Sequence, residues 1–293
     1  ILKKIKKLYL FEGNLFKKSV ILRLKYLNTG KNFYSLSSPS IVRDRETVEA
    51  GTQLKFPWRL GNFAVDFKRY RDNLSKVADK LAMVQTIFTG GTLISIPSLP
   101  SLNINGSFNS AVDQNINNRM VNNYTLVYGA GIAHPVSSRF SYNFRGQNSE
   151  FHDLKLKGNN RDTLSVTSGM TLNNRDMFLV NFGVTYVDSK TEDRTAQYRS
   201  TIFSLTGNYK IIPGKLILTY WGDITTRYDK NIQLLTSTEA DTFAVSPNLE
   251  VTYYFNPRFG LTFGYGNTYK RDNKSTAAPF TEDRIQTRLN VGF

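Results

Sequence analysis

Residues 259–266 read Phe-Gly-Leu-Thr-Phe-Gly-Tyr-Gly. Successive side chains of a β-strand point to opposite faces, so this stretch has one bulky apolar face and one small face. Phe259, Leu261, Phe263 and Tyr265 make up the first face, and glycine or threonine makes up the second. This pattern is typical of a transmembrane β-barrel, in which the bulky face contacts lipid and the small face lines the lumen.

The same alternation extends from this stretch in both directions. Toward the C-terminus, Ile285, Leu289, Val291 and Phe293 share one parity, and Thr287 is the only polar member of that set. Toward the N-terminus, at least four more segments alternate in this way, so we expect a lipid-facing set that comprises Phe178, Val180, Phe182, Phe203, Leu205, Leu218, Tyr253, Phe259, Leu261 and Phe263. The sequence therefore predicts an all-β, antiparallel, up-and-down transmembrane barrel.

Composition supports this class. The chain has 293 residues, 13% aromatic residues and no cysteine, which excludes disulfides and thiolate chemistry. The mean hydropathy of −0.35 argues against a helical membrane protein but not against a barrel, because only every second strand residue faces lipid. The formal net charge is +15. Since the basic residues are spread along the chain, we favour solubility and a basic lumen or rim over nucleic-acid or acidic-lipid binding, and expect no nucleic-acid partner.

Connections between the predicted strands alternate between short and long. Short turns carry Pro, Gly or Asn, whereas the long connections are polar and charged. Sorting by length is typical of outer-membrane barrels, which have short periplasmic turns and long extracellular loops. The short turns are expected at Pro57, Pro97, His134, Asn173, Pro213 and Pro257, and the long loops at residues 147–161, 188–197, 229–241 and 271–282.

About 14–16 strands are predicted in a single domain spanning residues 1–293, each near the roughly ten residues that a tilted transmembrane strand needs. Our count of about fifteen is odd, and a bacterial single-chain barrel has an even number. Either one strand is miscounted, or upstream strands precede this chain. The stretch from Arg69 to Met83 is the place for a miscount, because Leu74, Val77 and Leu81 have the spacing of a short helix. We favour upstream strands, which makes this the C-terminal part of a larger barrel.

Two resemblances point the same way. The terminal run with Leu289, Val291 and Phe293 resembles the C-terminal signal of bacterial outer-membrane barrels, which the barrel-insertion machinery reads. Residues 31–36, 43–47 and 71–74 are similar to segments of large outer-membrane barrels of the Bacteroidota and their relatives. In that family a Tyr-Ser-Leu segment leads into an Asp-x-Glu-Thr strand, and a later hairpin carries Asp-Asn-Leu. The resemblance implies a surface-exposed barrel in the bacterial outer membrane and implies no established chemistry.

Residues for catalysis or metal binding are few. His134 is expected in a short turn, and His152 in a long loop beside Asp153, with no nucleophile fixed near either. Gly260, Gly264 and Gly266 alternate with bulky residues, which indicates a crowded lumen face instead of a phosphate loop. The aspartates of the long loops do not have EF-hand spacing. We therefore predict no enzyme activity, no cofactor and no metal.

Charged residues of the predicted lumen face carry the remaining functional signal. More of them are basic than acidic, as in pores that favour anions. The alternative is a set of internal ion pairs that brace a filled barrel, and the sequence leaves both open. The basic candidates are Arg23, Lys25, Lys55, Lys68, Arg145, Lys210 and Arg227, and the acidic residues opposing them are Glu49, Asp66, Asp223 and Glu250.

Three classes of function follow. The first is a channel or transport barrel, or a component of an envelope translocation assembly. The second is a structural, surface-assembly or adhesion barrel with a closed lumen, and the third is a rim-site outer-membrane hydrolase, which we rank last. The expected partners are outer-membrane lipid, the barrel-insertion machinery and, through the extracellular loops, other envelope proteins.

Overall fold

The computed structural model describes residues 5–15, 19–30, 44–57, 60–75, 82–114, 121–174, 177–233 and 236–291. These residues form one short 3-10 turn, η2 (Lys157–Asn159), and otherwise strands and their connections. None of them belongs to a helix that is long and apolar enough to cross a membrane. The strands are β1 (Ile5–Leu15), β2 (Val20–Thr29), β3 (Arg45–Lys55), β4 (Gly61–Asp72), β5 (Met83–Ile94), β6 (Ser101–Asp113), β7 (Asn122–Pro135), β8 (Phe140–Asp153), β9 (Arg161–Asn174), β10 (Phe178–Thr191), β11 (Ala196–Ile212), β12 (Leu216–Gln233), β13 (Thr236–Asn256), β14 (Phe259–Asp272) and β15 (Phe280–Val291).

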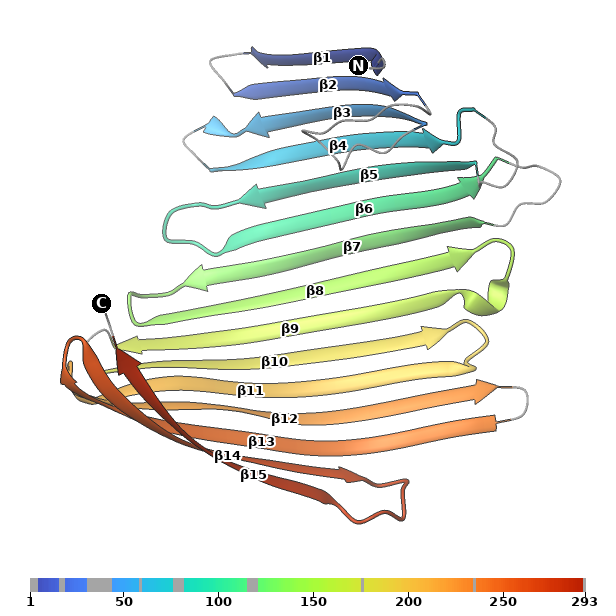
Figure 1. The fold of residues 1–293 in the computed structure, drawn as a ribbon. Coiled ribbons are helices and arrows are strands. Elements are labelled where there is room, and N and C mark those ends of the chain that lie inside the picture. Colours follow the sequence, from blue (N-terminus) through green and yellow to red (C-terminus); the bar gives the residue numbers. More distant parts are fainter. Residues whose placement is uncertain are drawn as a thin grey trace. The chain divides into compact units, whose positions relative to one another are not determined.

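The strands follow one another in the sheet in the order of the sequence, from β1 to β15 (Figure 1). Neighbouring strands whose register is defined run antiparallel. The prediction of an all-β, antiparallel, up-and-down fold is therefore confirmed. β1 and β15 stand at the two ends of this order, and no pairing joins their described residues, so the sheet is not closed.

The chain divides into two compact units. The first comprises Ile1–Ala130 and Asn148–Asp162, and the second comprises Gly131–Gln147 and Thr163–Phe293. Within each unit, alternation of apolar and polar residues gives the sheet two chemically different faces, because the side-chain period of a strand is two.

In the second unit the predicted apolar residues are aligned across strands. Directly opposite residues of an antiparallel pair lie on the same face, so the register decides whether separate apolar rows merge. They do merge, because most pairings on this face match bulky residues with bulky residues or glycine. The pairs include Phe182 with Leu205, Tyr209 with Leu218, Leu218 with Val251, Val251 with Phe263, and Leu261 with Leu289. All ten residues of the predicted lipid-facing set share this face, which we call the apolar face.

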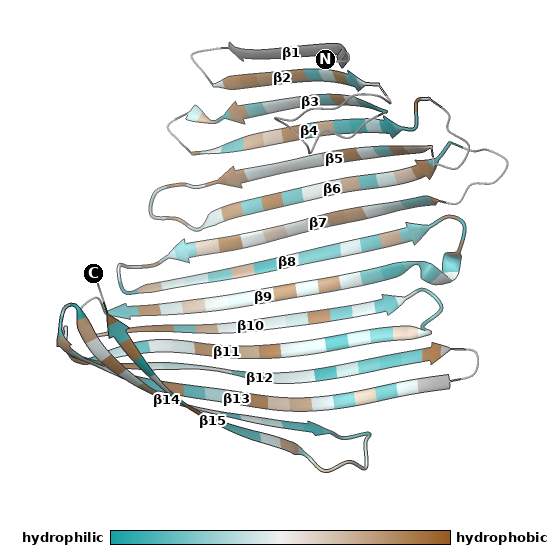
Figure 2. Ribbon diagram, in the orientation of Figure 1, coloured by the Kyte–Doolittle hydropathy of each residue, from teal (hydrophilic) through white to brown (hydrophobic). Residues whose placement is uncertain are grey.

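The first unit has the same two-faced construction. One row of paired residues crosses it from Leu24 through Ala50, Phe67 and Phe88 to Phe108. The next row, one residue along each strand, has the opposite character and contains Arg23, Gly51 and Asp66. Hydrophobic and hydrophilic residues accordingly mix along the strands that Figure 2 colours by hydropathy, from β2 onward.

The strands of the second unit are longer than the sequence suggested. Residues 188–197 and 229–241 were expected as long loops, and both expectations are wrong. β10 and β11 continue to Thr191 and from Ala196, and the ladder between β12 and β13 continues to the pair Gln233 and Thr236. Polarity misled the prediction, because backbone ladder hydrogen bonds form equally well between polar residues in water.

The other two long connections are also shorter than expected. β8 runs to Asp153 and β9 begins at Arg161, and β15 begins at Phe280. From β3 onward, each odd-numbered strand is joined by a turn to the even-numbered strand that follows it. Because consecutive strands are antiparallel, these turns lie at one edge of their unit. These are the connections expected at Pro57, Pro97, His134, Asn173, Pro213 and Pro257.

Several expectations fall outside the described residues. They concern Phe293 of the terminal signal, the segment at residues 31–36, and the helical spacing that includes Val77 and Leu81. In the stretch from Arg69 to Met83, where a short helix was expected, β4 ends at Asp72 and β5 begins at Met83.

Candidate functional site on the polar face

All seven basic candidates lie on the polar face of their own unit. In the first unit Arg23 and Lys25 lie on β2, Lys55 on β3 and Lys68 on β4, and the register places them on the side away from Leu24 and Phe67. In the second unit Lys210 and Arg227 share the face of Ser204 and Asp223. Arg145 has the parity of Asn143, whose side chain lies over Gly169. The acids Glu49, Asp66, Asp223 and Glu250 share the same polar faces.

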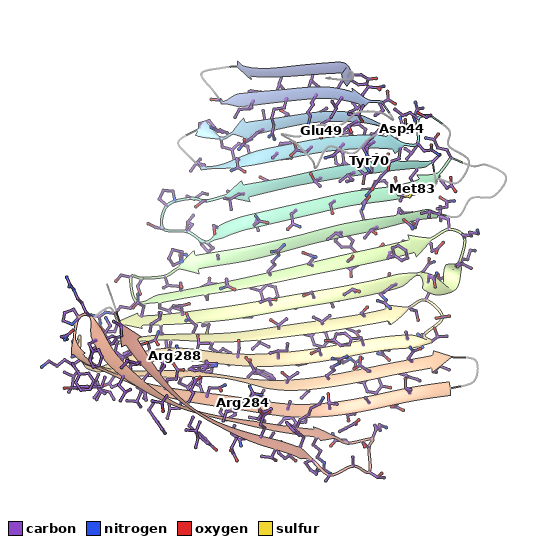
Figure 3. All side chains as sticks on the ribbon, in the orientation of Figure 1. Asp44, Glu49, Tyr70, Met83, Arg284 and Arg288 are labelled. Atoms are coloured by element: carbon purple, nitrogen blue, oxygen red, sulfur yellow. The ribbon has the colours of Figure 1, made fainter. Side chains whose placement is uncertain are left out.

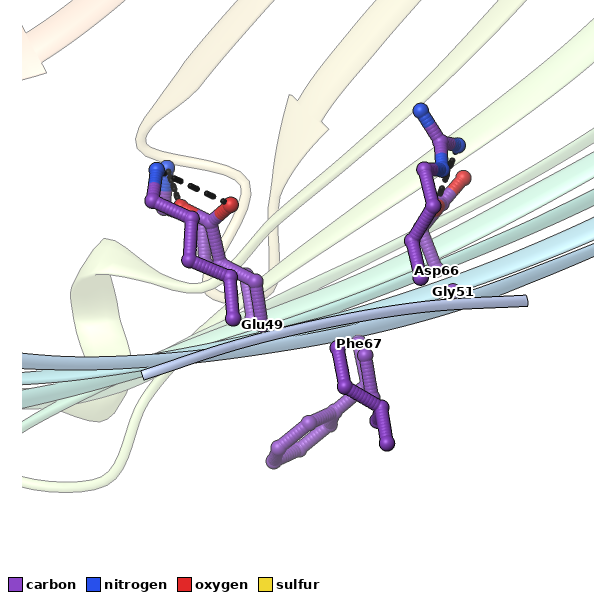
Figure 4. A pocket seen from close by; sticks show the side chains of 9 residues that line it. Glu49, Gly51, Asp66 and Phe67 are labelled. Carbon is purple, nitrogen blue, oxygen red and sulfur yellow. Dashed lines mark hydrogen bonds and ion pairs between the residues drawn. The ribbon is translucent and has the colours of Figure 1, made fainter. Parts of the chain in front are cut away.

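Arg23 and Asp66 form an ion pair that crosses an intervening strand. Nη2 of Arg23 donates to Oδ1 of Asp66 at 3.2 Å, although Arg23 is on β2 and Asp66 is on β4. Gly51 of β3 lies between them, and a Cβ built there would stand 2.2 Å from Oδ1 of Asp66. The missing side chain is what allows the two charged groups to meet. Figure 4 shows Asp66 above the sheet on the side of Glu49, and Phe67 on the other side.

Two residues further along each strand lies a second cluster. Glu49 of β3 accepts from Nζ of Lys25 at 3.4 Å and pairs with Nζ of Lys68 at 3.1 Å. One carboxylate therefore holds two ammonium groups, one from each neighbouring strand. The two clusters and the backbone between them line a hollow of ≈ 330 Å³ (Figure 4).

The other basic candidates have different surroundings. Nε of Arg227 donates to Oδ2 of Asp229 at 2.5 Å, and its guanidinium lies 5.1 Å from the ring centre of Tyr198. Arg145 donates to Gln147 at 3.2 Å. Lys55 is exposed and forms no ion pair with the described residues. At least four of the seven, namely Arg23, Lys25, Lys68 and Arg227, thus have a carboxylate partner, so the polar face carries less free positive charge than the sequence alone indicated.

A glycine also opens a cross-strand contact in the second unit. Oε1 of Glu250 on β13 accepts from Nε2 of Gln286 at 2.5 Å and from Nη2 of Arg288 at 3.3 Å, and both donors are on β15. Gly264 of β14 lies between them, and a Cβ built there would stand 2.9 Å from Gln286. The expectation that these glycines mark a crowded face is confirmed at Gly264.

A polar network joins residues 44–45 at the start of β3 to residues 70–75 at the end of β4. Arg45 forms a two-pronged ion pair with Asp72 and lies 4.3 Å from the ring centre of Tyr70. Asp44, at the start of β3, accepts from N and Oγ of Ser75 at 3.1 and 2.7 Å. Figure 3 shows Asp44 and Tyr70 toward the same end of β3 and β4. No pairing between these two segments was predicted from the sequence, because the contact depends on the β3–β4 register.

Both histidines lie in strands, and the expected placements are wrong in different ways. His152 belongs to β8 and not to a loop, where it stacks on Tyr124 at 4.7 Å between ring centres and lies 3.8 Å from Glu150. His134 is in β7 one residue before its end, with its ring edge toward Tyr142. Strand extension past the polar residues accounts for both differences.

No group of three or more His, Asp or Glu side chains with metal-binding geometry occurs among the described residues. The contacts of His152 in the described chain are an aromatic ring and a carboxylate, which do not supply a nucleophile. What the polar face offers chemically is fixed charge and hydrogen-bond donors.

No protein-family model matches this chain, and no curated protein is similar to it.

Proposed function

We propose that this chain forms a transmembrane β-barrel, or the C-terminal part of a larger one, in a bacterial outer membrane. Its apolar face contacts lipid and its polar face lines the lumen. The barrel serves as a channel or transport barrel, or as a component of an envelope translocation assembly, and it has no catalytic role. Its partners are outer-membrane lipid, the barrel-insertion machinery, and other envelope proteins at the loops.

One observation carries the proposal: the apolar face of β10–β15 is continuous and uncovered. Phe263 is 53% exposed, Leu289 57% and Ile285 71%. Soluble proteins rarely leave contiguous apolar patches larger than a few hundred Å² in water, so a face of this kind needs an apolar environment.

The height of this face fits a membrane. On β13 the residues of that parity from Phe243 to Phe255 are uncharged, and Asp241 and Glu239 follow beyond them. Twelve residue steps at about 3.3 Å span about 40 Å along the strand, or about 30 Å along the membrane normal at a tilt of about 40°. That length is close to the hydrocarbon thickness of about 30 Å.

The number of strands supports a larger barrel. The described residues form fifteen strands, from β1 to β15, which is an odd number. Closure by antiparallel pairs alone needs an even number of strands, as single-chain bacterial barrels have. An odd number of further strands between β15 and β1 satisfies that requirement, and it also covers the polar backbone edges that lipid cannot satisfy.

The second candidate is a structural or surface-assembly barrel with a closed lumen. The cross-strand contacts of Glu49 and Glu250 favour it, since paired charges brace a filled interior as readily as they line a pore. Single-channel conductance of the purified protein in planar bilayers separates the two candidates. Stepwise conductance supports the channel, and its absence in a correctly inserted protein supports the closed barrel.

Lipid contact is tested with single spin labels, since the chain has no native cysteine. Phe263→Cys and Thr262→Cys are a matched pair, because they are adjacent on β14 and on opposite faces. In liposomes, the spin label at position 263 should be accessible to oxygen, which dissolves in lipid. The spin label at position 262 should be accessible to a water-soluble nickel complex, or to neither of the two reagents. Nickel access at position 263 would overturn the membrane assignment.

A further inference from the structure

The hollow over β2, β3 and β4 contains more positive than negative charge. Its charged side chains are Arg23, Lys25 and Lys68 against Glu49 and Asp66. The arrangement leaves one positive charge in excess. All five are only partly covered, with side-chain exposures from 31% for Glu49 to 56% for Arg23.

The three cations keep donors that the carboxylates do not use. Arg23 donates from a single nitrogen to a single oxygen of Asp66, although a guanidinium can bind a carboxylate with two parallel hydrogen bonds. Lys25 and Lys68 each contact one oxygen of Glu49. An ammonium group has several donors, so each lysine retains hydrogen-bonding capacity toward the hollow.

The two clusters stand apart along the strands. Arg23 and Lys25 are two residues apart on β2, as are Asp66 and Lys68 on β4. That spacing is roughly 6.6 Å at the usual strand rise. Figure 4 shows the two groups of side chains rising from the same side of the sheet with a space between them. A small anion in this space has the guanidinium on one side and the ammonium groups on the other.

We propose that this hollow binds the oxyanion of a small solute, a phosphate or carboxylate group, on the wall of the lumen. This site rests on the proposed barrel function, for which it names the substrate class. The volume of ≈ 330 Å³ is at the lower end of the range for ligand pockets, about 300–1,000 Å³, which fits a small metabolite. Gly51 keeps the floor of the site open, since any side chain there meets Asp66.

The binding test uses the purified full chain in detergent micelles, with inorganic phosphate and acetate as probes in calorimetric titrations. Lys25→Gln/Glu49→Gln/Lys68→Gln removes the cluster without leaving a lone carboxylate. Arg23→Gln/Asp66→Asn removes the other ion pair with no change in net charge. Both variants should bind the probes at least about tenfold more weakly than the unaltered chain, since charge-assisted hydrogen bonds are lost. Tighter binding of phosphate identifies a phosphate ester, and equal binding identifies a carboxylate.

Lys55→Gln is the matched control. Lys55 is on the same face of β3 and has no ion pair among the described residues, so its loss changes the general field but not the hollow. It should leave binding unchanged. Equal weakening by Lys55→Gln and by the triple variant would mean that only diffuse charge attracts anions, and the site would be wrong. Failure of the unaltered chain to bind either probe also overturns it.

Conductance separates this site from the barrel proposal. A chain that conducts ions but binds no probe keeps the proposed function and loses the site. A chain that binds the probes at the hollow but neither inserts nor conducts keeps the site and loses the transport function. A difference in migration between unheated and heated samples in detergent gels confirms which variants are folded. If the triple variant does not fold, the double variant Arg23→Gln/Asp66→Asn still tests the site.

Discussion

Arg23 and Asp66 form an ion pair over Gly51, although the strands that carry them are not neighbours. Such a pair exists only where the middle strand lacks a side chain. Gly264 has the same relation to Glu250 and Gln286 at the other end of the chain. The polar faces of both units therefore contain contacts that reach across three strands.

The first prediction concerns Gly51. Gly51→Ala places a Cβ 2.2 Å from Oδ1 of Asp66, so the carboxylate must move and the pair with Arg23 must break. Because this ion pair is half-exposed, we expect the free energy of unfolding to fall by no more than about 1 kcal/mol. Urea titration of the protein in micelles measures it. Gly146→Ala is the control, since no atom lies within 4 Å of its added Cβ, and it should not destabilise.

The second prediction concerns a buried hydroxyl on β14. Thr262 is 3% exposed, and its Oγ1 lies 2.8 Å from Oγ1 of Thr252 and accepts from Nδ2 of Asn290 at 2.8 Å. Thr262→Val keeps the shape and leaves both partners unsatisfied. We expect the free energy of unfolding to fall by about 1–3 kcal/mol, measured by urea titration. Thr262→Ser keeps the hydroxyl and should lose less. Equal losses would show that the hydrogen bonds contribute nothing.

The third prediction separates two arginines of the polar face by ion selectivity. Nε of Arg227 pairs with Oδ2 of Asp229 at 2.5 Å, whereas Arg145 donates to the neutral Gln147 and forms no ion pair with the described residues. In a conducting barrel Arg145→Gln removes an unpaired charge and should shift the reversal potential in a salt gradient toward cations, because wall charges set the local ion concentration. Arg227→Gln/Asp229→Asn removes both charges of a pair and should leave the reversal potential nearly unchanged. An equal shift in both variants would contradict the pairing, and no shift for Arg145→Gln would place that residue outside the lumen.

The fourth prediction concerns sidedness. Pro213 lies in the β11–β12 turn and Ala277 in the β14–β15 connection, which are at opposite edges of the second unit. A membrane-impermeant maleimide applied to intact cells should label Ala277→Cys and leave Pro213→Cys unlabelled. Both should react after lysis. Labelling of both in intact cells would refute the expected topology.

The fifth prediction concerns the pH dependence of a turn. Asp193 accepts from N of Thr195 at 3.1 Å and from its Oγ1 at 2.8 Å, and these hydrogen bonds hold the pKa of Asp193 below its ordinary value. A carboxyl with a lowered pKa stabilises the folded turn above its unfolded pKa of about 3.9, and this stabilisation is lost as pH falls through the lowered pKa. Amide protection of Thr195, followed by NMR, should be constant at neutral pH and fall only in strong acid.

Asp193→Asn is the control for this effect. Asparagine can still accept one hydrogen bond but does not titrate, so the amide protection of Thr195 should then be weaker at neutral pH and independent of acidification. If the amide protection of Thr195 in this variant still fell in strong acid, as in the unaltered chain, the pH dependence would come from another titrating group.

The sequence by itself determined the alternation along each strand and therefore the two faces of the sheet. Face identity is local, since it depends only on the parity of Phe259, Leu261 and Phe263 along one strand. It also predicted about 14–16 strands, of which the described residues form fifteen, and the positions of the short turns at Pro213 and Pro257, because glycine, proline and asparagine restrict the backbone locally.

Only the tertiary structure decided which side chains meet across strands. The register brings Arg23 to Asp66, Lys25 and Lys68 to Glu49, and Asp44 to Ser75, at separations of up to 43 residues. A shift of one residue in any strand turns every side chain to the other face, so these contacts cannot be read from one strand alone. Strand length was also misjudged, because the ladder continues through polar residues as long as its backbone hydrogen bonds find partners.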